Sequence, residues 1–135
     1  MDYKIRAVQK GDLEQILDIW LEASVISHDF IDSNYWVSKI RDMKDIYIPN
    51  SETYVYEDET GICGFLSLCE NTLAAIFVKP DKQSKGIGGK LLQKAKELRN
   101  EINLTVYKEN SKSVLFYRKA GFYSVREQKD KNTEN

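Results

Sequence analysis

The fold of this chain is decided by the segment Val78-Lys79-Pro80-Asp81-Lys82-Gln83-Ser84-Lys85-Gly86-Ile87-Gly88-Gly89-Lys90. Before it, the run from Leu73 to Val78 is rich in β-branched, aromatic and small residues, which is typical of a strand. After it, apolar residues recur at helical spacing, at Leu91, Leu92, Ala95 and Leu98. The pattern predicts a strand, a short turn and a helix that begins within the glycines.

The start of this helix is suited to bind a phosphate group. The first backbone N–H groups of a helix have no partner within it, and they lie at the positive end of the helix dipole. Glycines let the backbone approach a ligand closely, because no Cβ obstructs it. Lys82, Lys85 and Lys90 add positive charge. The segment therefore predicts an anion site, although a tight turn before a helix would use the same glycines.

The glycine spacing excludes two common phosphate-binding motifs. A P-loop needs the order Gly-x-x-x-x-Gly-Lys-Ser/Thr, which is absent here. A dinucleotide fingerprint needs Gly-x-Gly-x-x-Gly, and its third glycine is missing after Gly86 and Gly88. The anion is therefore not expected to belong to a nucleotide held by either motif.

Periodicity along the chain predicts six strands and four helices in the order βααβββαβαβ. Strands are expected at 3–8, 53–57, 62–68, 73–78, 102–107 and 122–126. Helices are expected from Asp12, from Asp32 to before Pro49, from the glycines to about Arg99, and from Ser111 to Ala120, with Asp12 and Asp32 as N-caps and Gly121 as a stop. The fold class is α/β, a mixed sheet with helices on both faces.

Composition indicates one soluble domain. The chain has 135 residues, 41% of them hydrophobic and 30% charged, and a net charge of −1, which argues against nucleic-acid binding. We expect a domain at 1–126 and a disordered polar tail at 127–135, since no apolar residue follows Arg126. Two cysteines and one histidine indicate neither a disulfide nor a metal site. Without an apparent signal peptide or membrane span, a cytoplasmic protein is expected.

Two ordered motifs resemble the GCN5-related N-acetyltransferases (GNAT). Gln83 to Gly88 matches the Gln/Arg-x-x-Gly-x-Gly/Ala pyrophosphate loop of that family. The family's second motif has Asn, then Ser three residues later, then Phe-Tyr and Ala-Gly-Phe. It resembles the segment Asn110-Ser111-Lys112-Ser113-Val114-Leu115-Phe116-Tyr117-Arg118-Lys119-Ala120-Gly121-Phe122. The resemblance extends to about Arg126 and is closest to small bacterial members with a His-Asp-Phe-Ile segment, here His28 to Ile31. The resemblance thus implies a GNAT fold with a mostly antiparallel sheet.

The resemblance implies that acetyl-CoA lies between the fourth and fifth strands. Backbone groups of Phe77 and Val78 would then bond the pantetheine arm. The pyrophosphate would be held by the loop residues Gln83, Ser84, Lys85, Gly86, Ile87, Gly88, Gly89 and Lys90. Asn110, Ser113 and Tyr117 would complete the cofactor site, although Asn110 could equally act only as a helix cap.

Tyr117 is the predicted general acid. Asn110, Ser113 and Tyr117 lie at i, i+3 and i+7, which places them on one side of a helix. When an amine attacks the thioester, the departing CoA thiolate needs a proton, and a phenol with a pKa near 10 can supply it. The alternative is an aromatic side chain that only packs on the sheet.

The general base is less clearly indicated. Thr72 occupies the position where the family often has a carboxylate, and its hydroxyl cannot take a proton at neutral pH. Glu70 could act through water, or be a solvated hairpin residue. His28, with Phe30 and Trp36, lies on the expected acceptor side, where His28 could bind the amine, move protons or make a structural hydrogen bond. A neutral amine would need no dedicated base.

The chain departs from the family after Arg126, where no apolar face remains for a last strand. The sheet edge is then open, or covered by a partner such as a second copy of the chain. The resemblance implies an acetyl-CoA-dependent N-acetyltransferase for a primary amine in a small molecule, peptide or protein. The alternative is an acetyl-CoA-binding sensor with little or no catalysis.

Overall fold

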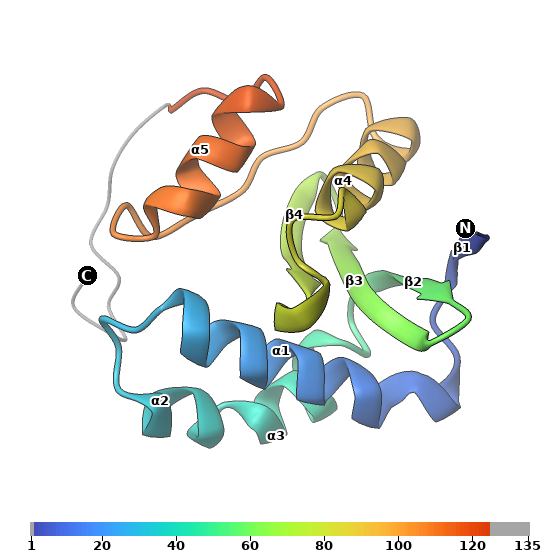
Figure 1. Cartoon of the computed structure of the whole chain (residues 1–135), viewed down its shortest axis with the longest axis vertical. Coiled ribbons are helices and arrows are strands. Elements are labelled where there is room, and N and C mark those ends of the chain that lie inside the picture. The colour runs from blue at the N-terminus through green and yellow to red at the C-terminus, as the bar shows by residue number, and fades with distance from the viewer. Residues whose placement is uncertain (1, 125–135) are drawn as a thin grey trace.

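The structure, a computed structural model, describes residues 2–124 and centres on an antiparallel sheet with helices on both faces (Figure 1). Its strands lie in the order β1-β2-β3-β4 and span Tyr3–Ala7, Glu52–Asp58, Gly61–Cys69 and Thr72–Val78. This confirms the predicted fold class. The tail expected at 127–135 and the end of the last predicted strand lie outside the described residues.

The helices fall into two groups along the chain. The first group follows β1 and consists of the 3-10 turn η1 (Lys10–Asp12), α1 (Leu13–Ser27), α2 (Ser33–Ser38), α3 (Ile40–Asp42) and the π-helical turn η2 (Met43–Tyr47). The second follows β4 and consists of the 3-10 turn η3 (Pro80–Lys82), α4 (Ile87–Leu98) and α5 (Ser111–Lys119). The single helix predicted after Asp32 is thus divided into three short pieces.

One face of the sheet is covered by the first group of helices. Ile16, Ile19 and Trp20 recur one turn apart on α1, so that all three are buried against the sheet. They pack on Val55 of β2 and Phe65 of β3, both fully buried, and Trp36 of α2 completes this cluster. The spacing of apolar residues in α1 therefore decides which side of the sheet it covers.

The opposite face is covered by α4. Its buried residues Leu91, Leu92 and Ala95 pack on Leu66 and Leu68 of β3, whose side chains point away from α1. Because strand residues alternate between faces, β3 can be buried on both sides only as a nearly continuous apolar run, and its sequence is one. Side chains of α5 pack against the same cluster as α4.

The predicted strand at 102–107 is replaced by a single bridge between Thr72 and Asn103, in the parallel sense. Leu73 donates its N–H to the Asn103 carbonyl at 2.9 Å, and Asn103 donates its own to Asn71 at 2.9 Å. Within residues 2–124, no backbone hydrogen bond joins 104–107 to β4. The two segments therefore separate after their first residues. The strand predicted to start at Phe122 is irregular over 122–124.

The expected helix ends are found, with one difference. Asp32 accepts a hydrogen bond from the Asn34 backbone, and Gly121 follows α5 in a left-handed conformation with φ of 101°. Asp12 precedes α1 as expected, but its side chain does not cap the helix. It instead accepts hydrogen bonds from the backbone of Gln9 and the guanidinium of Arg6, which hold it back towards β1.

Candidate active site

The opening between β4 and residues 104–107 is the structural basis of the site. A strand whose backbone groups have no neighbour on one side can hydrogen-bond an extended ligand. Phe77 and Val78, which we expected to contact the pantetheine arm, lie on β4 at the end where the segments have separated. The Val78 carbonyl already accepts a hydrogen bond of 3.1 Å from the side chain of Gln83. Gln83 therefore ties the start of the predicted phosphate loop to the end of β4.

The predicted phosphate loop has the conformation of an anion site. Ser84 and Gly86 both adopt left-handed backbone angles, with φ of 65° and 85°, and Gly86 directly precedes α4. The first N–H groups of α4 have no acceptor within the helix, and no acidic residue lies in its first turn. The helix dipole and these donors together favour a negatively charged group at this end.

Lys90 differs from the expectation. Its backbone N–H is donated to the Gly86 carbonyl at 3.1 Å, so it belongs to the helix and is not free for a phosphate. Its ammonium group lies 4.3 Å from the ring centre of Tyr3, a cation–π contact on the β1 side of α4. The free donors of the loop are therefore those that precede Lys90.

Gly88 connects the phosphate loop to α5. A Cβ at this position would lie 3.5 Å from the Phe116 ring and 3.9 Å from a methyl group of Val78. A longer side chain would therefore displace α5, whereas the positions of Gly86 and Gly89 are open on this measure. The second glycine of the motif therefore lies at the contact between α4 and α5, where a methyl group would fit in ordinary contact.

Asn110 is buried and uses both ends of its amide. Its Oδ1 accepts the Ser113 N–H at 3.2 Å, which confirms the predicted N-cap of α5. Its Nδ2 lies 3.3 Å from Nε2 of His28. Both the oxygen and the nitrogen of the side chain therefore have a partner within the protein, and Ser113 contributes its backbone N–H to the cap.

Tyr117 lies two turns after Asn110 on α5. It is half-buried, in edge contact with Phe116 and Phe122, whose ring centres are 5.1 and 5.7 Å away. Burial raises the pKa of its phenol well above the ordinary value of 10.0. The group thus stays protonated across the physiological range. Within the described residues its hydroxyl makes no hydrogen bond to the protein, so it can donate to a ligand.

His28, Phe30 and Trp36 meet at one end of the sheet opening, together with Tyr107. The ring of His28 lies 5.8 Å from Phe30, 5.0 Å from Trp36 and 5.3 Å from Tyr107. The indole N–H of Trp36 is buried and has no partner among residues 2–124. Sequence reasoning missed Tyr107. The only available signal was its position at the end of a predicted strand, directly before the Asn110 motif.

Glu70 and Thr72 lie at the other end of β4. The Thr72 hydroxyl donates to the Asn103 side chain at 2.9 Å, where the two segments are still paired. Glu70 is an exposed residue of the β3–β4 turn with φ of 55°, and its carbonyl accepts from Arg99. Thr72 and Val78 are the first and last residues of β4, six steps and roughly 20 Å apart in an extended strand. Neither side chain is therefore brought near the phosphate loop.

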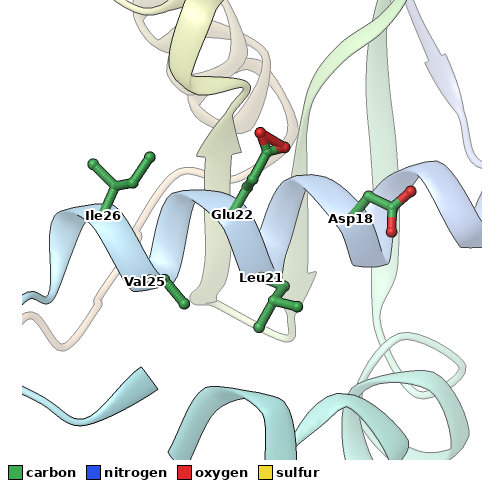
Figure 2. Close-up of a pocket in the computed structure, with 5 residues that line it drawn as sticks. All are labelled: Asp18, Leu21, Glu22, Val25 and Ile26. Atoms are coloured by element: carbon green, nitrogen blue, oxygen red, sulfur yellow. The ribbon is translucent and has the colours of Figure 1, made fainter. Parts of the chain in front are cut away.

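The outer part of α1 carries a further feature that sequence reasoning missed. Five residues line a shallow pocket along this helix: Asp18, Leu21, Glu22, Val25 and Ile26 (Figure 2). In Figure 2, Leu21 and Val25 point towards α2 and α3, whereas Glu22 and Ile26 point to the opposite side. The sequence signal was present, because α1 contains three carboxylates four residues apart and no Lys or Arg.

Comparisons of sequence agree with this geometry. The acetyltransferase (GNAT) domain model matches residues 49–124. The chain is 37% identical over 122 residues to the peptidyl-lysine N-acetyltransferase YiaC of Escherichia coli strain K12, covering 90% of this chain and 84% of that protein. It is 28% identical to the peptidyl-lysine N-acetyltransferase YjaB of the same strain, with 90% and 83% covered.

Solved structures share the fold. The solution structure of apo YjaB from Escherichia coli matches with a TM-score of 0.85 at 26% identity, covering 97% of this chain and 90% of that one. The PaiA N-acetyltransferase of Thermoplasma acidophilum, solved in complex with coenzyme A, matches with a TM-score of 0.82 at 24% identity, covering 98% and 96%.

Fold and sequence together define an acyltransferase built around an opened sheet. The chain belongs to the GCN5-related N-acetyltransferase (GNAT) family. It is an N-acetyltransferase that uses acetyl-CoA as its acetyl donor. No helix in the described part of the chain is long and apolar enough to cross a membrane.

Proposed function

We propose that this enzyme acetylates the ε-amino group of lysine in peptides or proteins. The observation that carries the proposal is the 37% identity, over 90% of the chain, to a relative named for that activity. The charge of α1 supports it. Asp18 and Glu22 form no ion pair within residues 2–124, and they would attract the basic residues that often flank an acceptor lysine.

The donor half of the site uses mainly backbone groups. The N–H groups of Lys85 to Gly89 would hold the pyrophosphate of acetyl-CoA at the start of α4. The N–H of Val78 would bond the pantetheine arm in the opening beside β4, whereas Phe77 is paired with Phe65 of β3. Gln83 and Ser84 would support the loop. Each of these contacts is made by a backbone whose direction the fold sets.

The reaction is a direct transfer. The neutral amine attacks the thioester carbonyl, the new C–N bond forms, and the C–S bond breaks with its electron pair on sulfur. Tyr117 would donate its proton to the departing thiolate and take one back from solvent, which also receives the proton lost by the amine. The Thr72 hydroxyl cannot take up a proton at neutral pH and donates to Asn103, and Glu70 is an exposed turn residue. We therefore propose that most of the rate comes from holding the amine beside the thioester.

The proposal is tested by measuring CoA release with acetyl-CoA and three kinds of acceptor. These are a peptide with one lysine between basic residues, the same peptide with that lysine already acetylated, and small amines such as spermidine and free lysine. Turnover with the first peptide alone supports the proposal. Faster turnover with a small amine would contradict it. Acetyl-CoA binding without turnover on any acceptor would instead indicate the sensor.

We also infer the extent of the domain, the location of the protein and its oligomeric state. We infer a catalytic domain at 1–126 with the tail at 127–135 outside it, supported by an apolar core that uses residues from β1 to Phe122. A cytoplasmic location is supported by two free thiols, Cys63 and Cys69. A homodimer covering the sheet edge left open after Arg126 is a further proposal, supported by residues 104–107, which form no ladder with another strand in the described part of the chain. Light scattering at micromolar concentration would test it.

A further inference from the structure

His28 and Asn110 form the centre of a chain of hydrogen bonds that joins the two helical layers. His28 Nδ1 lies 3.1 Å from the Ser24 carbonyl, one turn earlier in α1. On its other side, His28 Nε2 lies 3.3 Å from Asn110 Nδ2, and Asn110 Oδ1 caps α5 at Ser113. The chain thus runs from the last turn of α1 to the first turn of α5.

The partners leave only one assignment of protons. The Ser24 carbonyl can only accept, so Nδ1 of His28 carries the proton and donates it. The Ser113 N–H can only donate, so the oxygen of the Asn110 amide faces it and the nitrogen faces His28. Nε2 of His28 must therefore be bare and accept from Asn110. The link requires a neutral imidazole in the Nδ1–H form.

The hydrogen bond between His28 and Asn110 joins two helices that lie on opposite faces of the sheet. Helix α1 belongs to the core on one face of the sheet, and α5 packs on the other. The two meet where β4 and residues 104–107 have separated, beside Tyr107, whose ring lies 5.3 Å from His28. The hydrogen bond between His28 and Asn110 therefore crosses the sheet at its opening.

Among residues 2–124, α5 has few other contacts at its first turn. The helix has no fully buried residue. Its later half is attached to α4, through Phe116 against Gly88 and through Lys96, which donates to the Ala120 carbonyl at 2.6 Å. At its start, the contacts of Asn110 with His28 take that role. Tyr117 lies in this later half, next to Phe116, and about 10 Å along the helix from Asn110.

We propose that His28 is a positioning residue, which holds the start of α5 so that Tyr117 meets the sulfur of the thioester. His28 lies in the segment that also carries Phe30, on the expected acceptor side. It therefore links that segment to the helix of the proposed general acid. This inference rests on the proposed role of Tyr117.

The plain alternative is that His28 only fills space in an aromatic cluster. Its ring contacts with Phe30, Trp36 and Tyr107 would give the same stability if the ring nitrogens were absent. The two readings differ in what the nitrogen atoms do, so the test removes the nitrogens and keeps the ring.

The test compares four variants and one control variant with the wild type. His28→Phe keeps the ring and removes both hydrogen bonds, and His28→Gln can restore a donor and an acceptor. Asn110→Ser keeps the helix cap and is too short to reach His28. The double variant combines His28→Phe with Asn110→Ser. Ser111→Ala, an exposed change in the same turn of α5, is the matched control.

We expect kcat for a lysine peptide to fall roughly ten- to hundredfold in His28→Phe and in Asn110→Ser, since small misplacements of a reacting group cost this much. The KM of His28→Phe for acetyl-CoA should stay within about twofold, because the phosphate loop is unchanged. The double variant should be no worse than the weaker single one, because both remove the same link. His28→Gln should recover part of kcat. An unchanged kcat, or losses that multiply, would overturn the proposal.

A second measurement works without turnover and separates this inference from the proposed function. A 3-fluorotyrosine placed at position 117 reports its surroundings through its 19F resonance. We expect that resonance to move in His28→Phe and Asn110→Ser, to return towards the wild type in His28→Gln, and to stay in Ser111→Ala. If it stays in all of them, α5 does not depend on His28, whether or not any amine is acetylated. If His28→Phe does not fold, Asn110→Ser decides the result alone.

Discussion

Nε2 of His28 lies 3.3 Å from the amide nitrogen of Asn110, although 82 residues separate them in the chain. Both residues are buried, with 9% and 7% of their surface exposed. Since the ring nitrogen must accept this bond, protonation of His28 would place two N–H groups against each other. Burial acts in the same direction and lowers the pKa of His28 below its ordinary value of 6.5.

The stability of the protein should therefore depend on this histidine below neutral pH. A pKa lowered in the folded state means that the unfolded chain binds the proton more readily. The contribution of His28 is fully present above pH 6.5 and is lost as the pH falls towards its folded-state pKa. We expect the free energy of unfolding, measured by urea titration from pH 8 to pH 5, to fall less steeply in His28→Phe than in the wild type. Parallel pH profiles would contradict the assignment of a neutral His28.

Replacement of Tyr117 by phenylalanine should separate catalysis from binding. The hydroxyl has no hydrogen bond to the described part of the protein, so its removal should change the melting temperature little. We expect kcat for a lysine peptide to fall about 10²- to 10⁴-fold, the usual contribution of a general acid. The dissociation constant for acetyl-CoA, measured by calorimetry, should change less than about threefold. An equal loss in both constants would assign Tyr117 to cofactor binding.

Substitution of Asp12 by asparagine should weaken the attachment of α1 to β1 of the sheet. Arg6 donates to both carboxylate oxygens at 2.8 and 3.2 Å, and Gln9 donates its backbone N–H to one of them at 2.7 Å. A hydrogen bond to a charged group contributes about 1.5–3 kcal/mol to stability. We therefore expect Asp12→Asn to lower the free energy of unfolding by about 2 kcal/mol.

Two further measurements test this structural role of Asp12. Arg6 holds the pKa of Asp12 below its ordinary 3.8, so this contribution is present above that pH and is lost as the pH falls through the folded-state pKa. Glu57 also binds Arg6 but is more exposed, and Glu57→Gln should cost less than Asp12→Asn. If Glu57→Gln lowers the free energy of urea unfolding by more than Asp12→Asn does, Arg6 mainly stabilises the pairing of β1 with β2 instead.

The elements with a strong local pattern were predictable from the sequence. The α4 helix has apolar residues one turn apart, and the phosphate loop combines a strand end with glycines, so that short-range rules decide both. The caps at Asp32 and Asn110 follow from side chains that bond the next few backbone groups. These features depend on residues that are neighbours in the chain.

The remaining features depend on residues far apart in the chain. Residues 102–107 have the composition of a strand, yet Leu104 to Tyr107 make no ladder with β4, because the sheet opens there. The bond between His28 and Asn110 was beyond local rules for the same reason. Lys90 was expected at the phosphate from its place beside the glycines, but a helix turns each side chain, and this one faces Tyr3.

Equal substitutions at two glycines of the phosphate loop should have opposite effects. Gly86 has φ of 85°, where an L side chain is strained, so Gly86→Ala should destabilise the protein by about 1–2 kcal/mol. Gly89 lies inside the first turn of α4 with open space at its Cβ, so Gly89→Ala should stabilise it by about 0.5–1 kcal/mol. Urea unfolding of the two variants measures both changes.

Acetyl-CoA affinity should depend on the backbone conformation at these two glycines and not on the added methyl group itself. Strain at Gly86 would turn the first N–H groups of α4 away from the pyrophosphate, so its alanine variant should bind acetyl-CoA more weakly, while Gly89→Ala should bind as the wild type does. Calorimetric titration with acetyl-CoA measures this difference. Unchanged affinity in Gly86→Ala would place the pyrophosphate elsewhere, since a ligand held by these N–H groups cannot be indifferent to their direction.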